Sequence, residues 1–298
     1  MERILEYRIS ERDKGKSIKD FLKEAGYSRQ NLVELKKMSE SILVDGRWEY
    51  VTYRLQEGEV LHIHIQEKES TEKIVPVALP FPILYEDEDI IVLNKPANMP
   101  THPSLNNYEN TLANAAAFYF KQKNKSFCFR CINRLDRDTT GLTILAKHMV
   151  SCSILQDEML RRRIKREYLA IVDGAIEVDE GTIDAPIGRK EGSTIERMVD
   201  YENGEHAVTH YTVLERKENV TLVSLRLETG RTHQIRVHMT YIGHPLIGDF
   251  LYYPKDERMN RQALHAWHLS FEHPITKEKM NFEAPIPEDM LAFWNEIR

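Results

Sequence analysis

The chain lacks most of the features that mark secreted, membrane-spanning and metal-dependent proteins. Its 298 residues contain only three cysteines, too few for a disulfide scaffold. No run approaches the ~20 consecutive apolar residues that a membrane-spanning helix needs, and residues 1–6 have no apolar core of the signal-peptide kind. A Gly-rich phosphate loop and an H-E-x-x-H metal motif are both missing. We therefore expect a cytoplasmic protein that needs no membrane, cofactor or metal.

One pair of cysteines has the spacing of a metal or redox site. Cys128 and Cys131 form a C-x-x-C, but a zinc site would need a second matching pair, and only Cys152 remains. A thioredoxin-like role would place a helix at the motif, whereas the sequence predicts that a strand continues through it. Two buried or half-buried thiols are the favoured interpretation. His62 and His64 share a predicted strand face, but no carboxylate or cysteine spacing supports a metal there.

Positive charge in excess is also lacking, because the net charge is −6. The composition, with 41% hydrophobic and 30% charged residues, fits a folded protein with a core. The cations are nevertheless clustered, at 121–137 and again at 161–166. A locally basic face can bind a polyanion even on an acidic protein, since phosphate contacts are local. The alternative for each run taken alone is a solvated helix face.

Periodicity and composition divide the chain into two units. Residues 1–70 predict a small unit of two helices and short strands. The stretch 71–82 is polar and contains three prolines, which oppose both helix and central strand, so it is expected to be a linker. Residues 83–298 form the larger unit.

The larger unit alternates helices with hairpins. Alternating patterns predict one hairpin at 208–227 and another at 264–282. Apolar residues at helical spacing predict helices at 111–120 and 151–162, and Pro287 is expected to begin a closing helix. This order argues for an α+β fold with a mixed, mainly antiparallel sheet and flanking helices.

The most distinctive stretch runs from Asn133 to Lys147. Its two carboxylates, Asp136 and Asp138, lie among cations that include Lys147 itself, just ahead of an apolar run at 142–146. A carboxylate surrounded by cations is expected to stay ionised. At a strand end it can accept hydrogen bonds, bind a cation or attack an electrophile. The alternative is a purely structural ion pair.

Two further stretches carry candidate site residues. In residues 228–238, Gly230 allows a sharp exit from a strand, and Thr232 is expected to cap a helix. The alternative there is an amphipathic helix whose polar side, including Gln234, is solvated. The third stretch is Tyr168, which opens a predicted strand and on composition alone would be a core aromatic.

Together these stretches resemble the RluA family of pseudouridine synthases. Residues 133–141 are similar to the family signature His-Arg-Leu-Asp-x-x-Thr-Ser-Gly, with Asn in place of His and Thr in place of Ser. Residues 230–238 match Gly-Arg-Thr-His-Gln-Ile-Arg-x-His almost letter for letter. Residues 166–168 match Lys-x-Tyr with Arg166 in place of Lys, and residues 89–96 resemble the motif that braces the active-site strand. Four motifs thus follow in the family order.

The resemblance implies a cofactor-free RNA pseudouridine synthase that isomerises uridine in ribosomal or transfer RNA. Asp136 would be the nucleophile, attacking either the ribose or the uracil, and Tyr168 would stack on the base and move a proton. Arg236 is the first choice for the cation that pairs with Asp136; Arg231 is the second, or a phosphate contact. The target uridine must be flipped out of its stack, and Arg134 would help to take its place. The remaining predicted RNA-binding residues are Thr139, Asn133, His233 and Gln234.

The small unit resembles the alpha-L RNA-binding module, the S-four type domain of ribosomal proteins, which often precedes the catalytic domain in this family. We expect a monomer that binds RNA. Two alternatives are a catalytically silent RNA-binding or ribosome-assembly factor with the same fold, and a small-molecule hydrolase with an Asp nucleophile. The first would not need Asp136, Tyr168 and Arg236 together, and the second would leave the small unit without a purpose.

Overall fold

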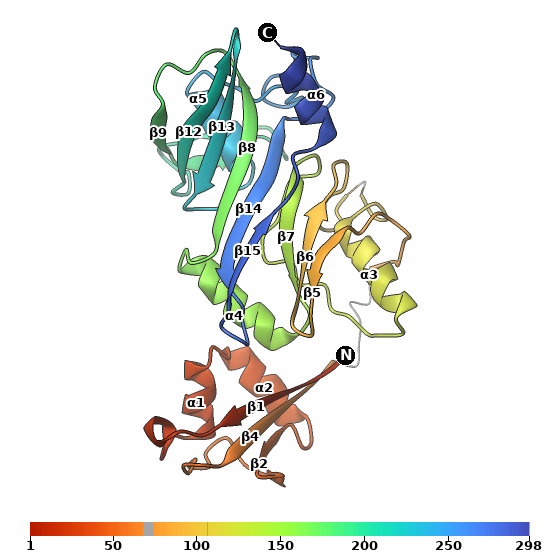
Figure 1. Cartoon of the computed structure of the whole chain (residues 1–298), viewed down its shortest axis with the longest axis vertical. Helices are drawn as coiled ribbons and strands as arrows, with labels where there is room; N and C mark the ends of the chain where they lie inside the picture. The colour runs from red at the N-terminus through yellow and green to blue at the C-terminus, as the bar shows by residue number, and fades with distance from the viewer. Residues whose placement is uncertain (68–73, 106, 298) are drawn as a thin grey trace.

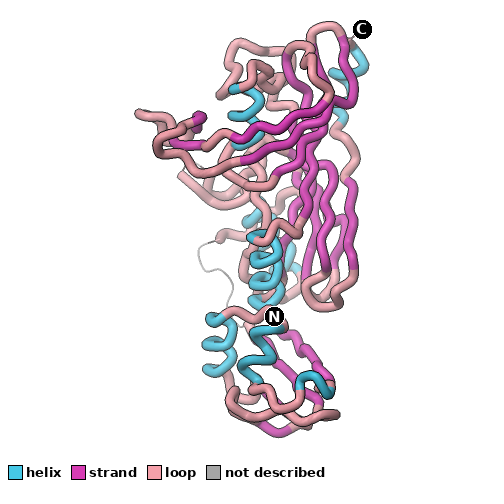
Figure 2. Tube along the Cα trace, turned by 90° about the vertical axis from the view of Figure 1, so that its left-hand side faces the viewer, coloured by secondary structure: helices cyan, strands magenta, loops and turns pink. Residues whose placement is uncertain are grey.

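The computed structural model describes residues 1–67, 74–105 and 107–297. The small N-terminal unit lies at one end of the long axis of the molecule, and the C-terminus lies at the other (Figure 1, Figure 2). The expected linker falls partly outside the described residues, and its described part has neither helix nor strand. Among the described helices, none is long and apolar enough to cross a membrane.

The small unit is a four-stranded antiparallel sheet with two helices, as predicted. Its strand order is β1-β4-β2-β3. Ser28 begins the second helix with a capping box, because its hydroxyl accepts the Asn31 N–H while the Asn31 side chain accepts the Ser28 N–H. The elements are β1 (Glu2–Arg8), a short 3-10 helix (Glu11–Asp13), α1 (Ile18–Glu24), α2 (Arg29–Lys37), β2 (Ile42–Val44), β3 (Arg47–Trp48) and β4 (Val60–Gln66).

The large unit is built on a nine-stranded sheet in the order β5-β6-β7-β14-β8-β13-β12-β9, with β15 also paired to β14. Only β7 and β14 run parallel among the described pairs of this sheet, so the predicted mixed, mainly antiparallel α+β fold is confirmed. The strands are β5 (Ile83–Glu86), β6 (Ile90–Lys95), β7 (Thr140–Ala146), β8 (Lys165–Asp173), β9 (Glu180–Asp184), β12 (Val208–Lys217), β13 (Val220–Leu227), β14 (Leu264–Glu272) and β15 (Lys279–Glu283). A separate pair joins β10 (Ile187–Arg189) to β11 (Arg197–Val199). The helices are α3 (Leu112–Gln122), α4 (Met149–Leu160), α5 (Gln234–Tyr241) and α6 (Glu288–Glu296).

The sheet is covered on both faces around β6. Along this strand, Ile90 and Val92 pack toward Leu155 of α4, whereas Ile91 and Leu93 pack on α3. A strand buried on both faces needs the continuous apolar run that the sequence contains. In the C-x-x-C segment, where the sequence predicts a strand, the pairing between described residues is an isolated bridge from Cys131 to Leu145.

The small unit is docked on the large one through α4. Val150 and Ile154 of α4 belong to the hydrophobic core of the small unit. Asn31 donates a hydrogen bond to the Met149 carbonyl at 3.2 Å, and Arg3 forms an ion pair with Asp89 at 2.8 Å. Apolar packing and paired charges together hold the two units in one arrangement.

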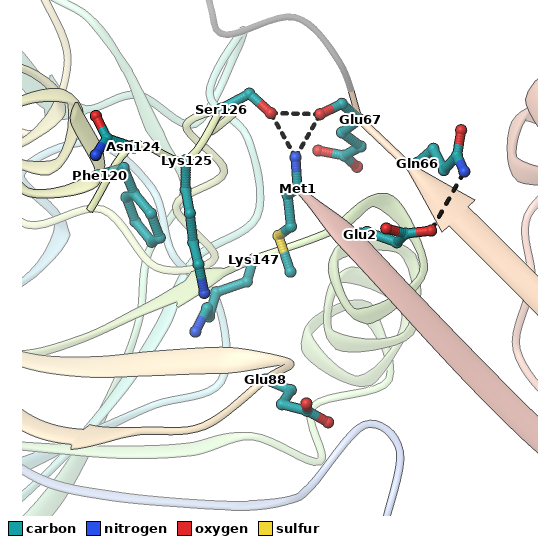
Figure 3. A pocket seen from close by; sticks show the side chains of 10 residues that line it. All are labelled: Met1, Glu2, Gln66, Glu67, Glu88, Phe120, Asn124, Lys125, Ser126 and Lys147. Atoms are coloured by element: carbon teal, nitrogen blue, oxygen red, sulfur yellow. Dashed lines mark hydrogen bonds between the residues drawn. The ribbon is translucent and has the colours of Figure 1, made fainter. Parts of the chain in front are cut away.

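A cavity of about 640 Å³ lies where β1 meets the large unit (Figure 3). Lys147 lines it and forms an ion pair with Glu86 at 2.9 Å. The expected grouping of Lys147 with Asp136 is therefore wrong. Seven extended residues of β7 separate the two positions, at about 3.3 Å per residue.

Candidate active site

One cleft of about 820 Å³ is lined by every predicted site residue. Its walls come from the loop before β7, the first residues of β8 and the turn that leads from β13 into α5. Segments far apart in the sequence therefore meet at one place. The predicted residues that line it are Asn133, Arg134, Asp136, Thr139, Tyr168, Arg231, His233, Gln234 and Arg236.

The loop that carries Asp136 is fastened to β7 at its start and held close to β14 at its end. At its start, the Asn133 amide donates to the Leu142 carbonyl and accepts from the Ile144 N–H, each at 2.9 Å. At its end, Gly141 lies so close to β14 that an added Cβ would be 2.2 Å from the Ala266 oxygen, and its φ is +111°. Only glycine fits such an approach in that conformation.

The Lys95 side chain forms hydrogen bonds with the middle of the loop that carries Asp136. Its ammonium donates to the carbonyls of Pro96, Met99 and Arg137, at 2.8, 2.9 and 3.0 Å. The side chain is fully buried, and this burial lowers the Lys95 pKa to about 7, against the opposing effect of the nearby Asp136 carboxylate. Through these hydrogen bonds Lys95 connects the end of β6 to Arg137, the residue after Asp136.

Arg236 connects two carboxylates. Its Nη1 donates to Asp136 Oδ2 at 3.1 Å, while Nε and Nη2 donate to Asp249 at 2.7 and 2.8 Å. Asp249 is fully buried, and Arg236 is 3% exposed. Burial lowers the Arg236 pKa, but Asp249 and then Asp136 outweigh it, so the pKa is raised overall. The bidentate pair fixes the guanidinium plane and leaves one edge for Asp136.

The helix that carries Arg236 begins differently from the prediction. Its first residue is Gln234, and the capping position is His233 in a left-handed conformation (φ 58°), without a side-chain cap. The cap expected from Thr232 is absent. The side-chain oxygen of Gln234 instead accepts hydrogen bonds from the turn before the helix, from Thr229 Oγ1 at 2.8 Å and from the Arg231 N–H at 2.9 Å. This leaves Gln234 only 3% exposed, not solvated.

His233 lies beside the two central charges. Its Nε2 is 3.9 Å from Asp136 Oδ2, and its Nδ1 is 2.9 Å from the Tyr252 hydroxyl. Burial lowers the His233 pKa, and Arg236 acts in the same direction, whereas Asp136 opposes both. Burial also raises the pKa of Tyr252, to about 12. At neutral pH both side chains therefore act as neutral hydrogen-bonding groups.

Tyr168 comes from a different element, β8. It is 4% exposed and lines the cleft together with Asp136. Burial is the main cause of its raised pKa, which the nearby Arg166 partly offsets. The phenol is therefore a neutral donor at neutral pH.

Two predicted RNA-binding arginines are placed differently from each other. Arg134 is exposed and has no hydrogen bond or ion pair with any residue that the structure describes. Arg231 forms an ion pair with Glu205 and donates to the His206 carbonyl at 3.1 Å. Of the two arginines considered as partners of Asp136, it is Arg236 that reaches the carboxylate.

Thr139, Asn133 and Gln234 already use their polar atoms within the protein. The Thr139 hydroxyl accepts from the Gln262 amide at 3.3 Å, and Gln234 donates to the Val208 carbonyl at 2.9 Å. These three side chains are 2–3% exposed and form the back of the cleft wall. Their direct contact with RNA stays a prediction.

Sequence reasoning gave no role to Asp249 or Lys95. Both signals were present, since Asp249 ends the Gly-His-Pro-Leu-Ile-Gly-Asp stretch and Lys95 precedes Pro96. A charged residue next to an apolar strand or turn indicates a buried ion pair only when its partner is known. The partner of Asp249 lies 13 residues away, across a helix.

One group of potential metal ligands lies elsewhere, formed by Asp87, Asp89 and His273. Its members do not line the cleft. Asp89 Oδ1 is 2.8 Å from both Arg3 and His148, and Asp87 is 2.8 Å from His273. Both carboxylates are therefore already paired with basic side chains of the protein. The pair between Arg3 and Asp89 joins the small unit to the large one.

Comparison with known proteins agrees with this geometry. Residues 89–241 match the family model described as RNA pseudouridylate synthase. The chain is 41% identical to YjbO of Bacillus subtilis (strain 168), described as an uncharacterized RNA pseudouridine synthase, over 92% of this chain and 96% of that protein. It is 42% identical to ribosomal large subunit pseudouridine synthase D of Vibrio cholerae, over 81% of this chain and 78% of that protein. The solved structure of human RNA pseudouridylate synthase domain containing 1 matches with a TM-score of 0.59 and 27% identity, over 70% of this chain and 84% of that chain.

The fold and the cleft are therefore those of an RNA-modifying isomerase. The chain belongs to the RluA family of RNA pseudouridine synthases, enzymes that convert uridine to pseudouridine in RNA. The family predicted from the four motifs is confirmed.

Proposed function

We propose that the chain isomerises specific uridines of large-subunit ribosomal RNA. The proposal is supported by relatives from several bacteria that are named as large-subunit synthases and are about 40% identical over most of the chain. Transfer RNA is the alternative substrate. Membership of the family establishes the reaction, and the assignment of large-subunit ribosomal RNA as the substrate is proposed.

The observation that carries the catalytic proposal is the meeting of Asp136, Tyr168 and Arg236 in one cleft. Asp136 is the nucleophile. Arg236, held by Asp249, aims the carboxylate and keeps it from rotating into solvent. Tyr168 stacks on the uracil and serves in proton transfer.

The reaction is balanced without any oxidant or cofactor. The bond between uracil N1 and ribose C1′ breaks, the uracil turns, and a bond forms between C5 and C1′. The proton on C5 leaves, and N1 gains one. Asp136 attacks either C1′ or the uracil ring, and both routes use the same carboxylate and release the C5 proton.

The uridine must leave its stack to reach Asp136, because the reacting atoms are inaccessible in a helix. Arg134 is exposed at the cleft and has no protein partner in the described part of the chain, so it is suited to replacing the flipped base. Arg231 and His233 contact the RNA at the other side of the cleft. Asn133, Thr139 and Gln234 hold the surfaces that make these contacts.

The small unit serves as an RNA anchor of the alpha-L type. Arg29 and Lys36 on α2 support this, since both are exposed and neither has an ion-pair partner among the described residues. Its docking on α4 sets a fixed distance between anchor and cleft, which suits a structured RNA. We also infer that the enzyme acts as a monomer in the cytoplasm, where its RNA substrate would be found.

A catalytically silent assembly factor with the same fold is the second candidate. Mapping of pseudouridines separates the two. In cells with and without the gene, carbodiimide-treated RNA is read by primer extension across ribosomal and transfer RNA. The proposal predicts loss of one or a few pseudouridines from large-subunit ribosomal RNA only. Loss confined to transfer RNA would mean that transfer RNA is the substrate. A full set of pseudouridines in both kinds of RNA would overturn the catalytic proposal.

A further inference from the structure

We infer that Arg166 is a phosphate-binding residue of the cleft, and that its guanidinium receives a phosphodiester of the target strand next to the flipped uridine. The inference rests on the proposed function only in requiring that this cleft takes RNA. It concerns the position where this chain has arginine and the family pattern has lysine.

The Arg166 side chain is incompletely partnered. Its Nε is buried and has no hydrogen-bond partner in the described part of the chain. The rest of the guanidinium is held by a long hydrogen bond, 3.5 Å from Nη2 to the Thr229 carbonyl, and by a hydrogen bond to the Tyr168 side chain. A buried donor without an acceptor is unfavourable and rare in folded proteins. An orphaned N–H at the wall of a cleft therefore indicates a partner that arrives with the ligand.

The charge of Arg166 is also uncompensated. Among the described residues, no carboxylate lies within ion-pair distance of it. Its neighbours differ, since Arg162 is paired with Glu228 and Arg236 with Asp249 and Asp136. A partly buried cation is stabilised by an anion, and RNA supplies one at each phosphate.

The position of Arg166 along β8 places it nearer the mouth of the cleft than Tyr168, where the RNA backbone would pass. Side chains two apart on a strand share a face, so Arg166 and Tyr168 both point into the cleft. Burial falls outward along the strand, from the buried Tyr168 through the half-buried Arg166 to the exposed Lys165. If Tyr168 stacks on the flipped base, the backbone that carries the base passes nearer the mouth, at the level of Arg166.

Gly230 leaves room for this arrangement. An added Cβ at Gly230 would lie 3.1 Å from Nη1 of Arg166. The absence of a side chain there leaves room for the guanidinium beside the turn before α5, where Arg166 lines the cleft. A planar fork of this kind can bind two phosphate oxygens at once, which a lysine cannot do.

A uracil carbonyl could also accept from Arg166, and salt dependence distinguishes the two partners. Each phosphate contact with single-stranded RNA contributes about 0.7 to the slope of log affinity against log salt. A contact with a neutral carbonyl contributes nothing to that slope.

The experiment measures the Kd of the full-length protein for an in vitro transcript of large-subunit ribosomal RNA, by filter binding at several KCl concentrations. The variants are Arg166→Gln, Arg166→Lys and, as a matched control for loss of one arginine charge, Arg216→Gln. Arg216 is exposed on β12, is paired with Asp179 and does not line the cleft. Circular dichroism checks that each variant is folded.

The inference predicts that Arg166→Gln raises Kd about tenfold at low salt and flattens the slope by about 0.7. Arg166→Lys keeps the wild-type slope, because the charge remains, and raises Kd less. Arg216→Gln matches the wild type in both. An unchanged slope for Arg166→Gln, with or without a higher Kd, would overturn the inference.

Tritium release from uracil C5 is measured on the same samples, so that the two proposals fail separately. A wild type that releases no tritium, beside an Arg166→Gln variant with the flattened slope, would overturn the proposed function and keep the phosphate contact. An active wild type, beside an Arg166→Gln variant with the wild-type slope, would keep the proposed function and overturn the phosphate contact.

Discussion

Asp249 accepts two hydrogen bonds from the Arg236 guanidinium, at 2.7 and 2.8 Å, from a position that water does not reach. The third contact of the same guanidinium, at 3.1 Å, goes to Asp136 in the cleft. A buried carboxylate outside the cleft thus fixes the guanidinium that holds Asp136, the proposed nucleophile. Asp249 is a positioning residue, and its effect should appear in kcat.

Replacing Asp249 by asparagine should lower kcat about 10- to 100-fold while KM for RNA changes little, because Arg236 is no longer held in its plane. Removing one partner of a buried ion pair should also lower the free energy of unfolding by about 3–5 kcal/mol. Steady-state kinetics and urea unfolding measure both. Asp173→Asn is the matched control, since it breaks a half-exposed pair with Arg258 outside the cleft. Equal kcat losses in the two variants would contradict the positioning role.

Replacing Lys95 by methionine should remove three hydrogen bonds, to the carbonyls of Pro96, Met99 and Arg137, of which the Arg137 carbonyl still accepts from the Met99 N–H. At about 1 kcal/mol for each lost hydrogen bond, the free energy of unfolding should fall by about 3 kcal/mol. Since one of those carbonyls belongs to Arg137, next to Asp136, kcat should fall more than tenfold. Lys125→Met, in the cavity at the junction of the two units, is the control and should change neither quantity. A stable but inactive Lys95 variant would mean that the lysine acts on the chemistry itself.

Acid should destabilise the protein through a buried histidine. His265 is fully buried, its Nδ1 is 2.8 Å from Thr140 Oγ1 at the start of β7, and burial lowers its pKa to about 4. Between pH 6.5 and about 4 the unfolded chain binds a proton that the folded chain does not, so stability is lost as pH falls through this window. The loss should be about 3 kcal/mol for this group. Chemical unfolding at several pH values measures it, and His265→Gln should flatten the curve; an equally steep curve would assign the loss to other groups.

The small unit should contribute to binding and not to chemistry. Arg29→Gln combined with Lys36→Gln should raise KM about tenfold and leave kcat unchanged, because two phosphate contacts are lost far from Asp136. The substitutions are preferable to removal of residues 1–70, which would expose Val150 and Ile154 of α4. Arg216→Gln with Lys255→Gln is the control of equal charge. A wild-type KM in the α2 variant would remove these side chains from RNA binding.

The sequence predicted the fold well wherever local pattern decides structure. The hairpin of β12 and β13 follows from alternation around a charged turn, and α6 follows from Pro287 ahead of an apolar stripe. In both cases the residues that set the structure are neighbours in the chain. The same is true of the buried strand β6, whose apolar run is continuous.

The failures came where distant contacts decide. Thr232 has the character of a helix cap, but the left-handed turn at His233 moves the helix start, and the side chain of Gln234 bonds back to the Arg231 N–H before the helix. Lys147 is close to Asp136 in sequence but is carried to the other end of β7. Asp249 could not be assigned from the sequence, because its partner is defined only once α5 is folded.

Release of tritium from RNA labelled at uracil C5 shows whether Asp136 is the nucleophile of an RNA pseudouridine synthase. Ribosomal and transfer RNA from cells without the enzyme serve as separate substrates, and Asp136→Asn, which keeps the size of the side chain, is compared with the wild type. We expect release from ribosomal RNA by the wild type and a rate at least about 1,000-fold lower for Asp136→Asn, with Kd for the RNA nearly unchanged. Release by Asp136→Asn at a rate near that of the wild type would contradict this role of Asp136.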